Sequence, residues 1–168
     1  MNQRTSSIFL LKARINDIMF YGDLMYIKEK LAQLGFEKTT PIQDGVFKSI
    51  DRNRHLVGLA PTGTGKTHAY LLPILERLNL SIKEVQAVIL VPTNELVLQI
   101  EKMLNEVEDN IIYKAYIGSS DKQREVEWLK KYQPQLIITT PKRLYEYVVD
   151  LNVLKVQNAK YLVLDEAD

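Results

Sequence analysis

The chain has 168 residues, enough for one domain with a sizeable core, and its 46% hydrophobic and 26% charged residues are ordinary for a globular protein. A net charge of +1 excludes a global basic field, so any binding to nucleic acid must use a local patch and oriented backbone amides. The lack of cysteine excludes disulfides and cysteine-ligated metal sites, and it is compatible with the cytoplasm, where we expect the protein to be located. Residues 8–11 are apolar but are cut by Lys12, too short for a signal peptide core.

Apolar residues follow two alternating spacings along the chain. Helical spacing from Leu24 to Leu34, ended by Gly35, predicts a first helix, and Pro41 opens a second that runs to Ile50. The predicted strands are residues 55–60, 85–91, 111–117, 136–139 and 160–164, and the predicted helices between them are 66–78, 94–107, 122–132 and 141–149. This alternation predicts a doubly wound, mostly parallel α/β sheet flanked by helices, with ligands at the carboxyl ends of the strands.

A glycine-rich loop, APTGTGKT at residues 60–67, follows the first of the alternating strands. Its glycines let successive N–H groups face an anion, and the next helix adds its positive end. Lys66 is expected to reach the outer phosphates, and the Thr67 hydroxyl to bind magnesium. An incidental glycine turn is the alternative, but the order of strand, loop, Lys-Thr and helix favours nucleotide binding. The predicted binding residues are Thr62, Gly63, Thr64, Gly65, Lys66 and Thr67.

Two carboxylates, Asp165 and Glu166, follow the last predicted strand. Alone they would be a solvated turn or a helix cap. After an all-apolar strand, and together with a phosphate loop, they predict that Asp165 holds magnesium and that Glu166 polarises the attacking water. With Lys66 they are the predicted catalytic residues. Asp168 would cross-link neighbouring motifs or fray at the chain end.

From about residue 20 onward the chain resembles the first RecA-like domain of a DEAD-box ATP-dependent RNA helicase, a P-loop NTPase fold. Residues 35–43, GFEKTTPIQ, resemble the Q motif of that family. The resemblance implies that Gln43 reads the adenine edge, because an amide offers one donor and one acceptor, and that Phe36 stacks on the ring with Lys38 nearby. The alternative for Phe36 is a core residue that caps the preceding helix.

Several other aromatic and histidine residues carry expectations of their own, from the same resemblance or from their packing pattern. Phe20 or Tyr21 stands near the family's upstream aromatic residue, which completes the adenine pocket. His68 follows the phosphate loop, and we expect an ordinary helix-surface position for it. Trp128 is expected to pack within its amphipathic helix.

Three further segments resemble the family's RNA-binding motifs. Residues 92–96, PTNEL, resemble PTREL with Asn94 in place of arginine, and residues 140–144, TPKRL, resemble TPGRL with Lys142 in place of glycine. Gly118-Ser119 stands in place of a glycine pair. Singly, each segment is explained as a helix cap, but the ordered set favours binding of the RNA backbone, independent of sequence and sensitive to salt. The predicted RNA-binding residues are Pro92, Thr93, Asn94, Gly118, Thr140, Pro141 and Arg143.

The resemblance also implies a domain organisation. Residues 1–22 would be an N-terminal extension, 23–54 the Q-motif helical segment and 55–168 a partial RecA-like domain, with the second RecA-like domain absent. In the family a Ser-Ala-Thr strand lies between the phosphate-loop strand and the strand ending at Asp165, and it would come after Asp168. We therefore expect a fold that is incomplete at its C-terminus, with unpaired backbone groups on both neighbouring strands and poor folding of the chain alone.

The predicted function is that of the N-terminal part of an RNA helicase, which uses ATP and Mg²⁺, binds RNA and is inactive as a fragment. A non-catalytic ATP- or RNA-binding module is the alternative. A further alternative is an unrelated phosphate-loop enzyme such as a kinase. The presence of both Gln43 and the segment Asp165–Asp168 argues against it.

Overall fold

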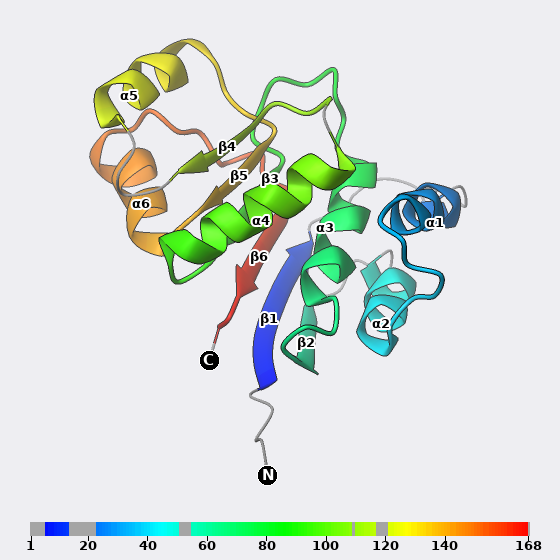
Figure 1. Ribbon diagram of the computed structural model, residues 1–168. Helices are drawn as coiled ribbons and strands as arrows, with labels where there is room; N and C mark the ends of the chain where they lie inside the picture. Colours follow the sequence, from blue (N-terminus) through cyan, green and yellow to red (C-terminus); the bar gives the residue numbers. More distant parts are fainter. Residues whose placement is uncertain (1–5, 14–22, 51–54, 109, 117–120, 168) are drawn as a thin grey trace.

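Figure 1 shows the computed structural model of the protein, in which a twisted sheet is flanked by helices. The structure describes residues 6–13, 23–50, 55–108, 110–116 and 121–167. Six strands form one sheet in the order β2-β1-β6-β3-β5-β4. Their bounds are Ser6–Ala13 (β1), Leu56–Pro61 (β2), Ala87–Leu90 (β3), Tyr113–Tyr116 (β4), Leu136–Thr139 (β5) and Tyr161–Asp165 (β6).

The helices begin and end where the sequence provides capping residues. Thr93 and Asp121 accept hydrogen bonds from the third backbone N–H of α4 and α5, and Gly35 ends the first helical segment with a φ of 80°. Their bounds are Asp23–Gln33 (α1), Pro41–Ser49 (α2), Lys66–Arg77 (α3), Asn94–Val107 (α4), Lys122–Lys131 (α5) and Pro141–Tyr145 (α6), which a single π-helical turn, η2, continues over Glu146–Asp150. No helix among these described residues is long and apolar enough to cross a membrane.

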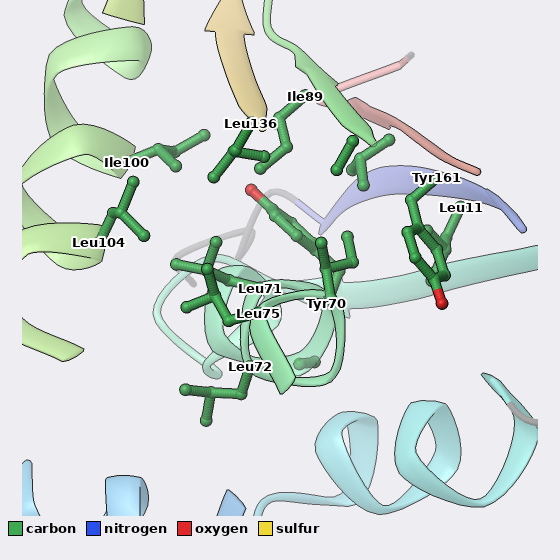
Figure 2. Packing of buried hydrophobic residues seen from close by; sticks show 14 of the residues in the cluster. Leu11, Tyr70, Leu71, Leu72, Leu75, Ile89, Ile100, Leu104, Leu136 and Tyr161 are labelled. Carbon is green, nitrogen blue, oxygen red and sulfur yellow. The ribbon is translucent and has the colours of Figure 1, made fainter. Parts of the chain in front are cut away.

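Two apolar clusters pack against the two faces of the sheet. The larger joins the inner sides of α1 to α4 to one face, and Figure 2 shows its centre, where Tyr70 of α3 lies among leucines and isoleucines. The smaller cluster packs Leu129 of α5 and Tyr147 of η2 against the opposite face. All four residues of β5 are buried, as expected for a strand covered on both faces.

Strand β1 occupies the position between β2 and β6 (Figure 1). It runs antiparallel to both, with Leu10 opposite Val57 on one side and opposite Leu164 on the other. The pairing continues past the end of β6, because the Ala167 N–H donates to the Ile8 carbonyl at 2.9 Å. The expectation of two unpaired strand edges at this position is therefore wrong, because residues 6–13 supply the missing backbone partners.

The side chains of β1 fit one face of this position. Phe9 and Leu11 are buried in the larger cluster. The Phe9 ring lies over Gly58 of β2, where an added Cβ would come within 2.2 Å of it. On the opposite face Val57 and Leu59 are 69% and 63% exposed, so that this part of the sheet is covered on one side only.

The rest of the predicted architecture is confirmed. Every predicted helix and strand is present, most of them within two residues of the predicted bounds, and the neighbouring strands β6, β3, β5 and β4 pair in parallel as the alternation implied. Strand β3 begins two residues later than predicted, and the side chain of Gln86 just before it bonds the Asn79 backbone. Strand β1 was not predicted from the sequence.

Candidate nucleotide and RNA site

The predicted functional segments follow four strands that point in one direction. The glycine-rich loop follows β2, Pro92 follows β3, Thr140 follows β5, and Asp165 ends β6. Since β2 and β6 are both antiparallel to β1, their carboxyl ends lie at the same edge of the sheet. The fold thus brings the predicted residues to one edge, as expected for an open α/β sheet.

The glycine-rich loop has the backbone shape of an anion-binding turn. Gly63 and Gly65 have φ values of 78° and 85°, in the left-handed region that favours glycine, and Gly65 is the N-cap of α3. The Thr64 hydroxyl donates to the Pro61 carbonyl at 2.7 Å and braces the turn, while Thr62 lies exposed at its tip. The positive end of α3 and the loop amides together can hold an anion.

Lys66 lies inside this loop rather than in solvent. Its ammonium donates to the carbonyl of Ala60 at 2.7 Å and to that of Pro61 at 3.3 Å, and the residue is only 7% exposed. These two carbonyls hold the charge at the base of the turn, where it can attract a phosphate group.

Asp165 is held by donors on both carboxylate oxygens. Oδ2 accepts from the Tyr70 hydroxyl at 2.8 Å, and Oδ1 accepts from the Glu166 backbone N–H at 3.0 Å. Burial raises the pKa of Asp165, and the two hydrogen bonds offset only part of that rise. Burial and the Asp165 charge also raise the pKa of Tyr70 well above its usual range, so that the phenol keeps its proton and donates it. Tyr70 was not predicted from the sequence, because its helical spacing marks it only as a core residue.

Glu166 stands at a strained point of the backbone. Its φ is 55°, which is uncommon for a residue with a Cβ, and it is half-buried. The bond from Ala167 to β1 holds the chain just beyond it. Such strained positions concentrate at functional sites. Asp168 lies outside the described residues.

Gln43 connects the Q-motif segment to the phosphate loop. Its carbonyl accepts from the Thr40 N–H at 3.0 Å, and its amide donates to the Gly65 carbonyl at 3.3 Å. A Cβ on Gly65 would lie 2.5 Å from this amide, so that a glycine is needed there for contact as well as for conformation. Gln43 is 2% exposed, and each end of its amide keeps one further hydrogen-bonding position.

Phe36 and His68 lie beside this connection. The Phe36 ring is 46% exposed and meets the His68 ring edge-on at a centroid distance of 5.8 Å, so that Phe36 is not the core residue of the alternative reading. The expected surface position of His68 is wrong, because its ring is 6% exposed. Burial lowers its pKa and favours the neutral ring, whose Nε2 has no hydrogen-bond partner in the described part of the chain. Lys38 is exposed nearby, and Phe20 and Tyr21 lie outside the described residues.

A groove of 860 Å³ lies between the segments that follow β3 and β5. Its lining includes all but one of the predicted RNA-binding residues: Pro92, Thr93, Asn94, Thr140, Pro141 and Arg143. Gly118 lies outside the described residues. The Thr93 hydroxyl accepts from the Leu96 N–H at 3.3 Å, which is the capping role given as the alternative for this segment.

Arg143 is held in the wall of the groove. Its guanidinium lies 3.5 Å from a Glu125 oxygen, 3.3 Å from a Glu146 oxygen and 5.1 Å above the Tyr147 ring, with the side chain 13% exposed. Two carboxylates thus share this cation, which the sequence alone did not indicate. The neighbouring Lys142 is exposed on the groove.

The residues at the phosphate loop fit a magnesium-bound nucleotide. The two left-handed glycines leave the loop amides free of side-chain bulk, and an ammonium lies at the base of the turn. Thr67 in the first turn of α3 offers a hydroxyl and Asp165 at the end of β6 offers a carboxylate, and these are the oxygen ligands that Mg²⁺ prefers.

Comparison with known proteins identifies the family. The profile described as "DEAD/DEAH box helicase" matches residues 40–168. The chain belongs to the DEAD/DEAH box helicase family. It is 40% identical over 149 residues to the DEAD-box ATP-dependent RNA helicase CshB of Bacillus cereus, and 39% identical over 145 residues to YfmL of Bacillus subtilis, named a probable ATP-dependent RNA helicase. These matches cover 85% of this chain but only 34% and 38% of the relatives, so the chain spans about a third of their length.

Solved DEAD-box structures have the same fold. A DEAD-box protein of Methanococcus jannaschii superposes with a TM-score of 0.69 at 22% identity, over 89% of this chain and 40% of that one. The RNA helicase Prp28 of Chaetomium thermophilum, bound to ADP, superposes with a TM-score of 0.66 at 25% identity, over 90% of this chain and 39% of that one. These likenesses establish a RecA-like fold for the DEAD-box chain described here.

Proposed function

We propose that this DEAD-box chain is the N-terminal, ATP-binding part of an RNA helicase that couples ATP binding and hydrolysis to local unwinding of RNA. The observation that carries the proposal is the meeting of the phosphate loop and the Asp165-Glu166 turn, joined by the bond from Tyr70 to Asp165. We propose RNA unwinding only for the whole helicase. The curated relatives are about three times as long as the part of them that this chain matches. A cytoplasmic location is part of the same proposal.

The proposed roles at the phosphates follow from the geometry of the loop. The amides of Gly63 to Lys66 and the start of α3 bind the phosphate oxygens, and the Lys66 ammonium moves from the loop carbonyls to the outer phosphates. Thr67 and Asp165 would hold the magnesium ion, which supplies charge neutralisation when bound. Glu166 accepts a proton from the attacking water.

Adenine recognition is proposed for the Q-motif side of the loop. The free positions of the Gln43 amide, one donor and one acceptor, match the adenine edge. The half-exposed Phe36 ring offers an apolar face for stacking, and the exposed Lys38 adds positive charge beside it. Through the hydrogen bond from Gln43 to Gly65, binding of adenine would also affect the position of the phosphate loop.

RNA is proposed to bind in the groove between Thr93 and Arg143. The starts of α4 and α6 present backbone amides and hydroxyls there, which suit a phosphate backbone rather than base edges. Asn94, where arginine is usual in the family, and the two carboxylates on Arg143 reduce the positive charge on this wall. We therefore expect weak binding, with a salt dependence that is shallow because few phosphate charges are neutralised.

The test of the nucleotide site is binding of a fluorescent ATP analogue to the chain as it stands. Lys66→Ala should lower affinity at least about tenfold, because the loss of a charged hydrogen bond costs about 1.5–3 kcal/mol. Lys83→Ala is the matched control, because that exposed lysine lies at the amino end of β3, away from the loop. Equal affinities for both variants and the wild type would refute the assignment.

A non-catalytic nucleotide-binding module is the competing function. Glu166→Gln separates the two, because an amide cannot accept the water's proton. In the protein with its remaining domains, this variant should bind ATP normally and hydrolyse it far more slowly. Turnover that is absent in the wild type as well, with binding intact, would favour the module.

A further inference from the structure

Tyr70 lies where the phosphate-loop helix meets strand β6. It is three residues after Thr67, in the first turns of α3, and its ring is fully buried. The hydroxyl donates to Asp165 Oδ2 at 2.8 Å. Thr67, the other residue proposed to hold the metal ion, lies one helical turn before Tyr70 in α3. One buried hydroxyl therefore connects the helix that carries Thr67 to Asp165.

The rest of the ring is fixed by packing. Phe9 of β1 lies against it at a centroid distance of 5.5 Å, and the residues around it belong to the centre of the larger apolar cluster (Figure 2). With the ring held in this way, the hydroxyl is held at the carboxylate. Because the other carboxylate oxygen accepts from the Glu166 N–H, the Asp165 side chain is fixed in one orientation.

We propose that Tyr70 is a positioning residue that orients Asp165 toward the divalent cation of a bound nucleotide. The inference rests on the proposed nucleotide site. Tyr70 acts through this carboxylate and not on the nucleotide itself. The ring would pack equally well as phenylalanine, so a purely structural role and a positioning role differ only in the hydroxyl.

Tyr70→Phe therefore removes the proposed role and leaves the ring. In the 168-residue chain with saturating ADP, binding of Mn²⁺, measured by electron paramagnetic resonance, should weaken by about tenfold, as is usual when a residue that orients a metal ligand is lost. Affinity for ADP without metal should stay within about twofold, because the loop amides and Lys66 are untouched. Unchanged Mn²⁺ binding would overturn the proposal.

Tyr26→Phe is the matched control. Tyr26 of α1 also donates to a carboxylate, Glu108 Oε2, at 3.0 Å, but it lies outside the nucleotide site. This variant should bind Mn²⁺ and ADP as the wild type does. If Tyr70→Phe loses metal, nucleotide and its unfolding transition together, the residue only packs, and the proposal is wrong.

A second measurement needs no nucleotide. In a double-mutant cycle with Tyr70→Phe and Asp165→Asn, read by urea unfolding, the two changes should be coupled by more than about fivefold in the folding equilibrium constant. Additive effects would show that the hydroxyl does not hold the carboxylate, and would overturn the inference. A wild-type chain that binds no nucleotide would refute the proposed function instead, and the cycle would still decide the role of Tyr70.

Discussion

The sheet consists of two halves that follow different rules. In the parallel half, β6, β3, β5 and β4, successive strands are joined by helices that cross the faces of the sheet. In the antiparallel seam, β2, β1 and β6, the middle strand comes from the start of the chain and places Phe9 opposite both Gly58 and Asp165. Local sequence therefore determines the first half, whereas a distant segment completes the second.

The two halves also differ in how they are buried. Strand β5 of the parallel half is buried along its whole length, while in the seam Val57 and Leu59 lie on an open face. Stability of the seam therefore depends on one apolar face, led by Phe9 and Leu11, and on the backbone hydrogen bonds of β1. Because both the phosphate-loop strand and the strand of Asp165 end at the seam, its integrity sets the geometry of the candidate site.

The largest expected effect comes from Phe9→Ala, which removes the fully buried ring of the seam. It should lower the free energy of unfolding by about 3–5 kcal/mol, the usual cost of a Phe-to-Ala change in a core. Urea denaturation followed by circular dichroism measures it. Val57→Ala on the open face of the neighbouring strand is the control and should cost less than about 1 kcal/mol. Equal small losses for both variants would mean that β1 does not dock in the seam.

Gly58→Ala tests the same contact from the other strand. The added Cβ would lie 2.2 Å from the Phe9 ring, so the ring or the strand must shift, at a cost of about 2–3 kcal/mol. In the Phe9→Ala background the same change should cost almost nothing, because the obstacle is gone. The four unfolding free energies of this cycle measure the effect. Additivity would contradict the position of β1 opposite β2.

These two variants concern the part of the fold that could not be read from the sequence. Alternating helical and strand patterns predicted the parallel half, because each crossover is encoded within a few tens of residues. Strand β1 has the apolar residues of a strand, but its partners are about 50 and 155 residues away, and no turn signal points to them. Family resemblance left an empty position in the sheet and gave no indication that residues 6–13 would fill it.

The candidate site was predicted to a similar extent. The sequence motifs predicted Lys66, Asp165 and the two glycines of the phosphate loop, because phosphate binding requires these residue types at fixed spacing. The fold brings them to one edge of the sheet. Tyr70 and the two carboxylates on Arg143 were missed, since their roles arise from contacts between elements distant in sequence. His68 was misplaced, because a single histidine on a helix does not reveal which side of the helix is covered.

The parallel half has its own buried connection at the opposite edge of the sheet. The Gln135 side chain, 1% exposed, accepts from the Ile112 N–H at 3.0 Å and donates to the Leu80 carbonyl at 2.9 Å. Gln135→Leu should lower the free energy of unfolding by about 1–2 kcal/mol, because a buried backbone donor loses its partner. Gln99→Leu on the exposed side of α4 is the control, and chemical denaturation compares them. A loss in Gln135→Leu no larger than in the control would show that this edge is held by backbone pairing alone.

The smallest expected effect lies where the helices of the two halves meet. Glu108, at the end of α4, accepts from the hydroxyl of Tyr26 on α1 at 3.0 Å. Burial acts to raise the pKa of Glu108, but hydrogen bonds from Asn110 and Tyr26 and the charge of Lys30 outweigh it, so that the pKa falls below its usual 4.5.

A carboxyl with a lowered folded pKa adds stability above its unfolded pKa and loses it as the pH falls through the folded value. Glu108→Gln should therefore lower the free energy of unfolding at pH 7, by less than about 1 kcal/mol for a partly exposed pair, and the difference should shrink as the pH is lowered through 4.5. Urea denaturation at several pH values measures it, with the exposed Glu127→Gln as control. A difference independent of pH would mean that the Glu108 charge does not join α1 to α4, and that packing alone connects the helices of the seam to those of the parallel half.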